Sequence, residues 1–301
     1  MILITGANGN LGRRLIESLG EGFRVRAVVR SQRAARSITT AGVEVRIVDY
    51  LDLEAMAEAA QGCSHIVHLV GIIKESTGST YEAAHQGTST VIAQIAALAG
   101  VSRVVYLSIL GATLASRNPC LASKARAETL LLGGAVPVLV LRIPMVLGEG
   151  DFASRSLYHR ARRRFSLQLR ASSLEQPIYA GDVIEAIQCG IDGDRRDAGV
   201  GQSIVLDLAG PRSLSRRALT KSAATILGNR TRVISLPLWF GLLGAWLLEK
   251  VSADPPVSRA MLEVLDHDDD IDPRAAMDQL GMSLTPLEQA LRRCLVDSPP
   301  V

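Results

Sequence analysis

Short apolar runs and longer amphipathic segments alternate along the first half of the chain. The runs have the length and the β-branched content of buried strands, and the segments between them have the apolar spacing of helices. Strands that alternate with helices form a doubly wound parallel sheet, so the sequence predicts an α/β fold. The predicted strands are residues 1–5, 23–30, 43–48, 65–71, 103–108 and 138–142, and a long helix is predicted from Thr80 to Ala99.

The pattern changes near residue 150, and most of the chain beyond that point is expected to be helical. We expect a first domain, a Rossmann domain, made of residues 1–149 and completed by residues 178–208. Residues 150–177 and 209–301 are expected to form a smaller, mostly helical lobe for a substrate or a partner.

Two stretches of this lobe are unusual in composition. Arginines crowd residues 155–170, where we expect a solvated helix face, with contact to acidic lipid or a partner as the alternative. Residues 237–248 are apolar nearly all round, which favours burial inside the lobe. The alternatives for residues 237–248 are the lining of a lipophilic substrate pocket and a surface for a membrane or a partner.

Charge and cysteine content narrow the class of protein. The net charge of +3 is too small to favour nucleic acid as a partner. The four cysteines contain no C-x-x-C pair, which is typical of reduced thiols and argues against zinc. The first strand begins at Met1 and no apolar run reaches about 20 residues, so we expect neither a signal peptide nor a spanning helix. We therefore expect a cytoplasmic protein, with peripheral association at the inner face of the membrane left open.

A glycine-rich turn joins the first strand to the first helix. Glycines let the backbone approach a pyrophosphate, and the N–H groups at a helix start favour an anion. The spacing is G-x-x-G-x-x-G rather than G-x-G-x-x-G, but its place between strand and helix still predicts a dinucleotide site. The expected pyrophosphate contacts are Gly6, Asn8, Gly9, Asn10, Leu11 and Gly12.

The ends of the next strands indicate how the rest of a dinucleotide would bind. Arg30 ends the second strand, where an acidic residue would bind the 2′-hydroxyl of NAD and an arginine would pair with the 2′-phosphate of NADP. Arg30 therefore favours NADP(H) over NAD(H), with a solvated strand-end cation as the alternative. We expect Asp49 to accept a hydrogen bond from adenine, and Leu69, Val70 and Gly71 to lie beside the ribose.

Several of these motifs also occur together in a known superfamily. The matching pieces are the glycine turn, Leu69-Val70-Gly71, Ser108, Lys124, Arg142-Ile143-Pro144 and Ile178 to Val183. With these pieces the chain resembles an atypical or extended short-chain dehydrogenase/reductase, a resemblance that covers nearly the whole chain. Within that superfamily it is similar to the group containing the nucleotide-binding accessory subunit of respiratory complex I and its bacterial relatives. That closer similarity rests on residues 68–73, residues 148–152 and the tail between residues 236 and 288.

The resemblance implies roles for specific residues. In the superfamily a Tyr exchanges a proton with the substrate oxygen, a Lys four residues later holds the ribose and lowers the Tyr pKa, and a Ser binds the same oxygen. Ser108 and Lys124 match two of these positions, and Pro144 matches a position beside the cofactor. Cys120 stands where the Tyr is expected, either as a nucleophile activated by Lys124 or, as we favour, as a buried inert thiol. Tyr106 lies on a strand and is not expected to replace the missing Tyr.

The sequence as a whole predicts an NADP(H)-binding protein without a metal site. Residues 266–272 form an expected solvated acidic turn rather than a calcium loop, and His65 and His68 are expected to be ordinary strand residues. One hypothesis is an oxidoreductase or epimerase-like enzyme that acts on a lipophilic carbonyl substrate with altered chemistry. The alternatives are a non-catalytic, nucleotide-loaded structural or assembly factor linked to complex I or quinone metabolism, with a membrane-associated partner, and a sensor of the NADP/NADPH ratio.

Overall fold

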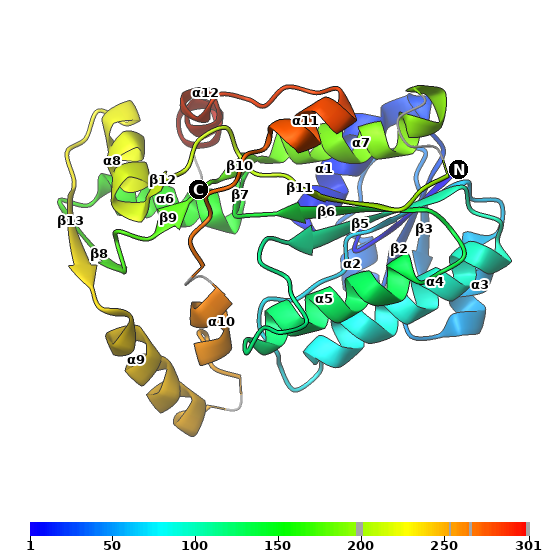
Figure 1. Ribbon diagram of the computed structural model, residues 1–301, viewed down its shortest axis with the longest axis horizontal. Coiled ribbons are helices and arrows are strands. Elements are labelled where there is room, and N and C mark those ends of the chain that lie inside the picture. Colours follow the sequence, from blue (N-terminus) through cyan, green and yellow to red (C-terminus); the bar gives the residue numbers. More distant parts are fainter. Residues whose placement is uncertain (197–200, 253, 265–266, 299–301) are drawn as a thin grey trace. The chain divides into compact units, whose positions relative to one another are not determined.

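The computed structural model describes residues 1–196, 201–252, 254–264 and 267–298 (Figure 1). The chain divides into two compact units. The first unit comprises Met1–Arg142 and Ile184–Leu206, and the second comprises Ile143–Val183 and Asp207–Val301.

The first unit is built on a seven-stranded sheet with the strand order β11-β6-β5-β4-β1-β2-β3. Strand β1 pairs in parallel with both β2 and β4, so that Thr5 lies opposite Val28 on one side and His68 on the other. The sheet thus reverses its winding beside β1, which is where such sheets bind ligands. The strands are β1 Ile2–Thr5, β2 Val25–Val29, β3 Glu44–Ile47, β4 His65–His68, β5 Arg103–Ile109, β6 Val138–Ile143 and β11 Ile204–Asp207.

Helices cover both faces of this sheet, as the sequence predicts for a Rossmann-like fold. Helices α3, α4 and α5 lie on one face, and α1 and α7 lie on the other (Figure 1). Leu3, Ile66 and Val104 of neighbouring strands form a buried core with Met56 of α3 and Ile95 of α4. The helical segments are α1 Asn10–Leu19, η1 Gly20–Gly22, α2 Gln32–Ala35, α3 Leu53–Ala60, η2 Glu82–Gly87, α4 Thr88–Leu98, α5 Pro119–Leu132 and α7 Ala180–Arg196.

The long helix predicted from Thr80 to Ala99 is interrupted. Its first part, η2, is a π-helix, and the regular helix α4 begins only at Thr88. The Thr88 hydroxyl donates to the carbonyl oxygen of Ala84 at 2.8 Å. This bond spans the junction between η2 and α4.

The second unit is largely helical, with three small strand pairs. A buried cluster that includes Leu147, Leu157, Leu219 and Leu291 forms its core. The strand pairs are β7 Val146–Leu147 with β10 Ile178–Tyr179, β9 Leu174–Glu175 with β12 Leu214–Ser215, and β8 Phe165–Leu169 with β13 Arg232–Leu236. The helical segments are α6 Phe152–Arg162, α8 Arg216–Ile226, α9 Leu238–Val251, α10 Arg259–Val264, α11 Arg274–Leu280, α12 Leu287–Arg292 and η3 Arg293–Asp297.

The apolar stretch of residues 237–248 forms most of α9, and the expectation that it is buried is wrong. Ala245 is the one buried residue of this helix, whereas Trp239 is 57% exposed and Trp246 is 41% exposed. A Cβ added at Gly241 would overlap the side chain of Leu169, so that side chain would have to shift to make room. Small residues therefore occupy the inner face, and the large apolar side chains point outward.

Among the helices in the described ranges, none combines the length and the hydropathy needed to cross a bilayer. The acidic segment predicted as a solvated turn is described from His267 onward, and Asp266 lies outside the described residues. Asp268 accepts the backbone N–H of Leu174 at 2.9 Å, and Asp272 pairs with Arg274 at 2.6 Å. Both carboxylates are thus bound by other groups of the same chain.

Candidate functional site

The glycine turn after β1 leaves no room for a side chain at two of its positions. Gly6 has a φ of +69°, and a Cβ added there would lie 3.0 Å from the carbonyl carbon of Leu69. A Cβ at Gly12 would lie 2.6 Å from the carbonyl oxygen of Gly6. Gly9 caps α1 with no side-chain hydrogen bond, and the first turn of α1 carries no acidic residue. The N-terminus of α1, with no side-chain cap and no acidic residue in its first turn, can therefore bind the pyrophosphate of a dinucleotide.

Tyr50 fixes this turn to the sheet, a role that the sequence did not reveal. Its hydroxyl accepts the N–H of Gly6 at 2.9 Å and donates to the carbonyl oxygen of Val28 at 2.8 Å. Burial raises the pKa of Tyr50, so the phenol stays protonated. The two bonded residues lie 44 and 22 positions away in the chain, so no local pattern indicates them.

The residues expected at the adenosine end lie at the same edge of the sheet. Arg30 follows β2, is exposed, and places its guanidinium carbon 5.9 Å from the centroid of the Tyr50 ring. Asp49 is also exposed, and its carboxylate accepts the N–H of Leu51 at 3.1 Å. Ser31 caps the short helix α2 by accepting the N–H of Ala34.

Lys124 is held beside the loop that follows β4. Its Nζ donates to the hydroxyl oxygen of Tyr106 at 3.1 Å and to the carbonyl oxygen of Leu107 at 2.9 Å. A Cβ at Gly71 would lie 3.0 Å from the same nitrogen, so Gly71 and Lys124 lie close together. Burial lowers the pKa of Lys124 to about 8, against smaller opposing effects of Cys120 and Glu128.

Ser108 is bound to an ion pair whose carboxylate is buried and whose guanidinium is partly exposed. Its hydroxyl donates to Glu128 at 2.5 Å, and the same carboxylate pairs with Arg142 at 2.6 Å. The carboxylate orients the hydroxyl proton of Ser108 toward itself. Donation of that proton to a substrate would therefore require this bond to break.

Cys120 lies one helical turn before Lys124 on α5. Cys120 is 2% exposed as a residue, and its thiol lies 3.6 Å from the carbonyl oxygen of Ile72. Burial raises the pKa of Cys120 to about 11, although the Lys124 cation opposes this. The thiol is therefore neutral at physiological pH, which supports the inert alternative over the nucleophile.

His85, in the π-helix η2, connects the loop after β4 to α5 by hydrogen bonds. This residue was not predicted from the sequence. Its Nε2 accepts the N–H of Ile72 at 3.0 Å, and its Nδ1 lies 2.7 Å from the hydroxyl of Ser123. Burial and the nearby Lys124 lower the pKa of His85 to about 3. Neutral His85 thus donates from Nδ1 and fixes the segment beside Gly71.

His68 and His65 are strand residues, as expected. The His68 Nδ1 lies 2.7 Å from the Thr5 hydroxyl, and its ring stacks on Tyr106 at 5.4 Å. Tyr106 is fully buried, which raises its pKa and keeps it from titrating. Pro144 directly follows β6 and belongs to the second unit.

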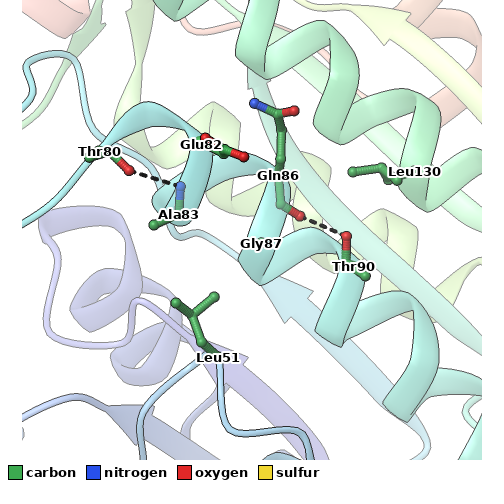
Figure 2. A pocket seen from close by; sticks show the side chains of 8 residues that line it. All are labelled: Leu51, Thr80, Glu82, Ala83, Gln86, Gly87, Thr90 and Leu130. Atoms are coloured by element: carbon green, nitrogen blue, oxygen red, sulfur yellow. Dashed lines mark hydrogen bonds between the residues drawn. The ribbon is translucent and has the colours of Figure 1, made fainter.

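An open hollow of about 490 Å³ lies beside η2 (Figure 2). Figure 2 shows Thr90 donating to the carbonyl oxygen of Gln86, with Leu51 on the far side of the hollow. Glu82 is the single ionisable residue of its lining, which includes none of the residues predicted to bind cofactor. We therefore assign the candidate site to the glycine turn and Lys124.

A parallel sheet with a glycine turn, an uncapped helix start and a buried lysine defines a dinucleotide-binding protein. The model of a family described as NAD(P)H-binding matches residues 6–156, and the chain belongs to this family.

Known relatives agree with this assignment. The chain is 28% identical to ceramide reductase of Caulobacter vibrioides over 79% of its own length and 74% of the relative. It is 27% identical to NADH dehydrogenase [ubiquinone] 1 alpha subcomplex subunit 9 of Mus musculus over 96% of its own length and 79% of the relative. The NADPH-dependent quinone oxidoreductase QOR2 of Escherichia coli, solved with NADPH, superposes with a TM-score of 0.71 at 21% identity, covering 97% and 98% of the two chains. The expected relationship to atypical short-chain dehydrogenase/reductases is confirmed.

Proposed function

We propose that the protein is an NADPH-dependent reductase of a lipophilic carbonyl compound, with Lys124 as the proton donor. The observation that carries this proposal is the placement of the Lys124 ammonium group against Gly71, beside the loop expected at the nicotinamide ribose. Of the groups around it, Cys120 has a raised pKa and His85 a lowered one, so neither changes charge near neutral pH. Lys124, with a pKa of about 8, can both give and regain a proton there.

The chemistry requires one hydride and one proton. When bound, NADPH would supply the hydride for the carbonyl carbon of the substrate. The Lys124 ammonium gives a proton to the carbonyl oxygen, which completes the alcohol and leaves a neutral amine that water reprotonates. The bonds to Tyr106 and Leu107 hold the ammonium in place during this transfer.

Arg30 supports NADPH rather than NADH as the reductant. It stands at the end of β2, where the 2′-position of the adenosine ribose is expected. A guanidinium offers a planar pair of donors that matches a phosphate. Ser31 and Arg33 follow within three residues and supply further donors.

The names of relatives support the substrate class. One relative is a ceramide reductase and a structural neighbour is a quinone oxidoreductase, so both names describe reductases of carbonyl or lipid-like compounds. The test follows NADPH oxidation by absorbance with a series of ketones and quinones whose alkyl chains lengthen stepwise. We expect kcat/KM to rise with chain length. The absence of NADPH oxidation with every compound of the series would contradict the proposal.

A second function is favoured by Cys120. A neutral, buried thiol stands where the superfamily has its Tyr, and a subunit of respiratory complex I is among the relatives. The protein would then be a structural or assembly factor that NADPH keeps folded, with a membrane-associated partner. Retention of NADPH through purification, together with recovery of respiratory proteins from native membranes and no turnover, would favour this function.

A further inference from the structure

Helix α9 presents its large apolar side chains outward, on one face of the second unit. Trp239, Leu243 and Leu247 follow each other at the spacing of one helical turn and are 57%, 49% and 51% exposed. Phe240 stacks on Trp239 with ring centroids 3.8 Å apart. The opposite face, with Gly241 and Ala245, packs inward. An exposed apolar surface of this kind marks an interaction site.

The neighbouring strand pair extends this surface. Phe165 and Leu167 of β8 and Ile234 of β13 are exposed, while Ser166 and Val233 between them are buried. Side chains two residues apart share a strand face, so Leu169 continues the row of Phe165 and Leu167. Leu169 in turn contacts α9 at Gly241, which joins the strand face to the helix.

The charged residues along these segments are mostly basic. Residues 162–169 and 230–251 contain a single acidic residue, Glu249, which is paired with Arg259 at 2.8 Å. The same segments contain six basic residues, all exposed, and two of them lie over aromatic rings of the surface. The basic residues are Arg162, Arg163, Arg164, Arg230, Arg232 and Lys250.

We propose that α9 and the β8–β13 strand pair dock the protein onto the surface of a bilayer that contains anionic lipid. Trp and Phe favour the boundary between headgroups and acyl chains, and flanking Lys and Arg favour anionic headgroups. A second copy of this chain is the poorer occupant, because its basic residues would face those of the first. Helix α9 has 14 residues, so it is about 21 Å long and suits the plane of the interface rather than a full span.

This docking does not depend on turnover, so its test is separate from that of the reductase. Trp239 and Trp246 are the two tryptophans of the chain, and both are on α9, so intrinsic fluorescence reports on this helix alone. The full chain is titrated with vesicles of phosphatidylcholine, with and without phosphatidylglycerol. We expect a blue shift and co-sedimentation with the anionic vesicles, weakened by salt, and quenching by brominated acyl chains.

Two variants decide the surface. The first variant carries Leu243→Glu and Leu247→Glu together, which places two charges on the exposed face. We expect each of the two substitutions to weaken vesicle binding by about tenfold. The second variant, Leu98→Glu, is the control. Leu98 is 71% exposed on α4 and is not part of the proposed surface, so this substitution should leave vesicle binding unchanged. The proposal is overturned by an absence of vesicle binding, by equal binding to both vesicle types, by binding that survives the double change, or by burial of α9 in a dimer.

Discussion

The ammonium nitrogen of Lys124 lies 3.1 Å from the hydroxyl oxygen of Tyr106, which stands on strand β5. Tyr106 is fully buried and stacked on His68, so it cannot meet a substrate. It orients the lysine instead. In the proposed mechanism the two functions of the superfamily's Tyr–Lys pair are divided differently: Tyr106 positions the lysine, and Lys124 exchanges the proton.

Lys124→Met should abolish the NADPH-dependent reduction. In the wild type the rate of a single turnover should stay level below about pH 8 and fall about tenfold per pH unit above it, because the neutral amine has no proton to give. Rapid-mixing measurements of NADPH oxidation from pH 6 to 10 check this. Lys221→Met, at an exposed position on α8, should change neither rate nor profile. A rate that does not fall above pH 8 would exclude Lys124 as the donor.

The same pKa has a consequence for stability. An unfolded lysine titrates near 10.4, so between about pH 8 and pH 10 the unfolded chain binds more protons than the folded one. The Lys124 contribution therefore makes the free energy of unfolding rise with pH over this range. Denaturation at a series of pH values should show that this rise is missing in Lys124→Met. An identical pH dependence in both proteins would refute the lowered pKa.

Tyr50→Phe should loosen the glycine turn. It leaves the Gly6 N–H without its acceptor and the Val28 carbonyl without its donor, at a cost of about 1–3 kcal/mol in the free energy of unfolding. We also expect weaker NADPH binding, because the turn beside the pyrophosphate loses its anchor. Urea denaturation and a fluorescence titration measure the two effects. Tyr158→Phe removes a hydroxyl that accepts from Arg162 near the surface of α6, and should have little effect on either.

Arg142→Met should destabilise the first unit strongly. Glu128 is buried and would keep its charge with Ser108 as its remaining described hydrogen-bond partner and the Lys124 cation nearby, a change that costs about 3–5 kcal/mol. Arg274→Met breaks a surface pair with Asp272 and should cost about 1 kcal/mol or less. Equal losses for the two variants on thermal unfolding would show that the Glu128–Arg142 pair contributes no more than a surface pair.

The fold could be predicted from the sequence because its signals are local. The glycine turn, the apolar strands and the four-residue spacing of Cys120 and Lys124 each depend on neighbours in the chain. Tyr50 and His85 were missed because their partners are set by the tertiary fold. The burial of α9 was predicted wrongly, since an apolar helix is usually buried; the small Gly241 and Ala245 on one face are the signal that could have indicated the inward side.

Arg30 offers the most direct test of the account, because the identity of the cofactor depends on it. Equilibrium titrations with NADPH and NADH give the two dissociation constants for the wild type and for Arg30→Ala. We predict that the wild type binds NADPH about tenfold or more tightly than NADH, and that Arg30→Ala loses this preference while its NADH affinity is unchanged. Equal affinities in the wild type, or a preference that survives the substitution, would contradict an NADPH site at the end of β2.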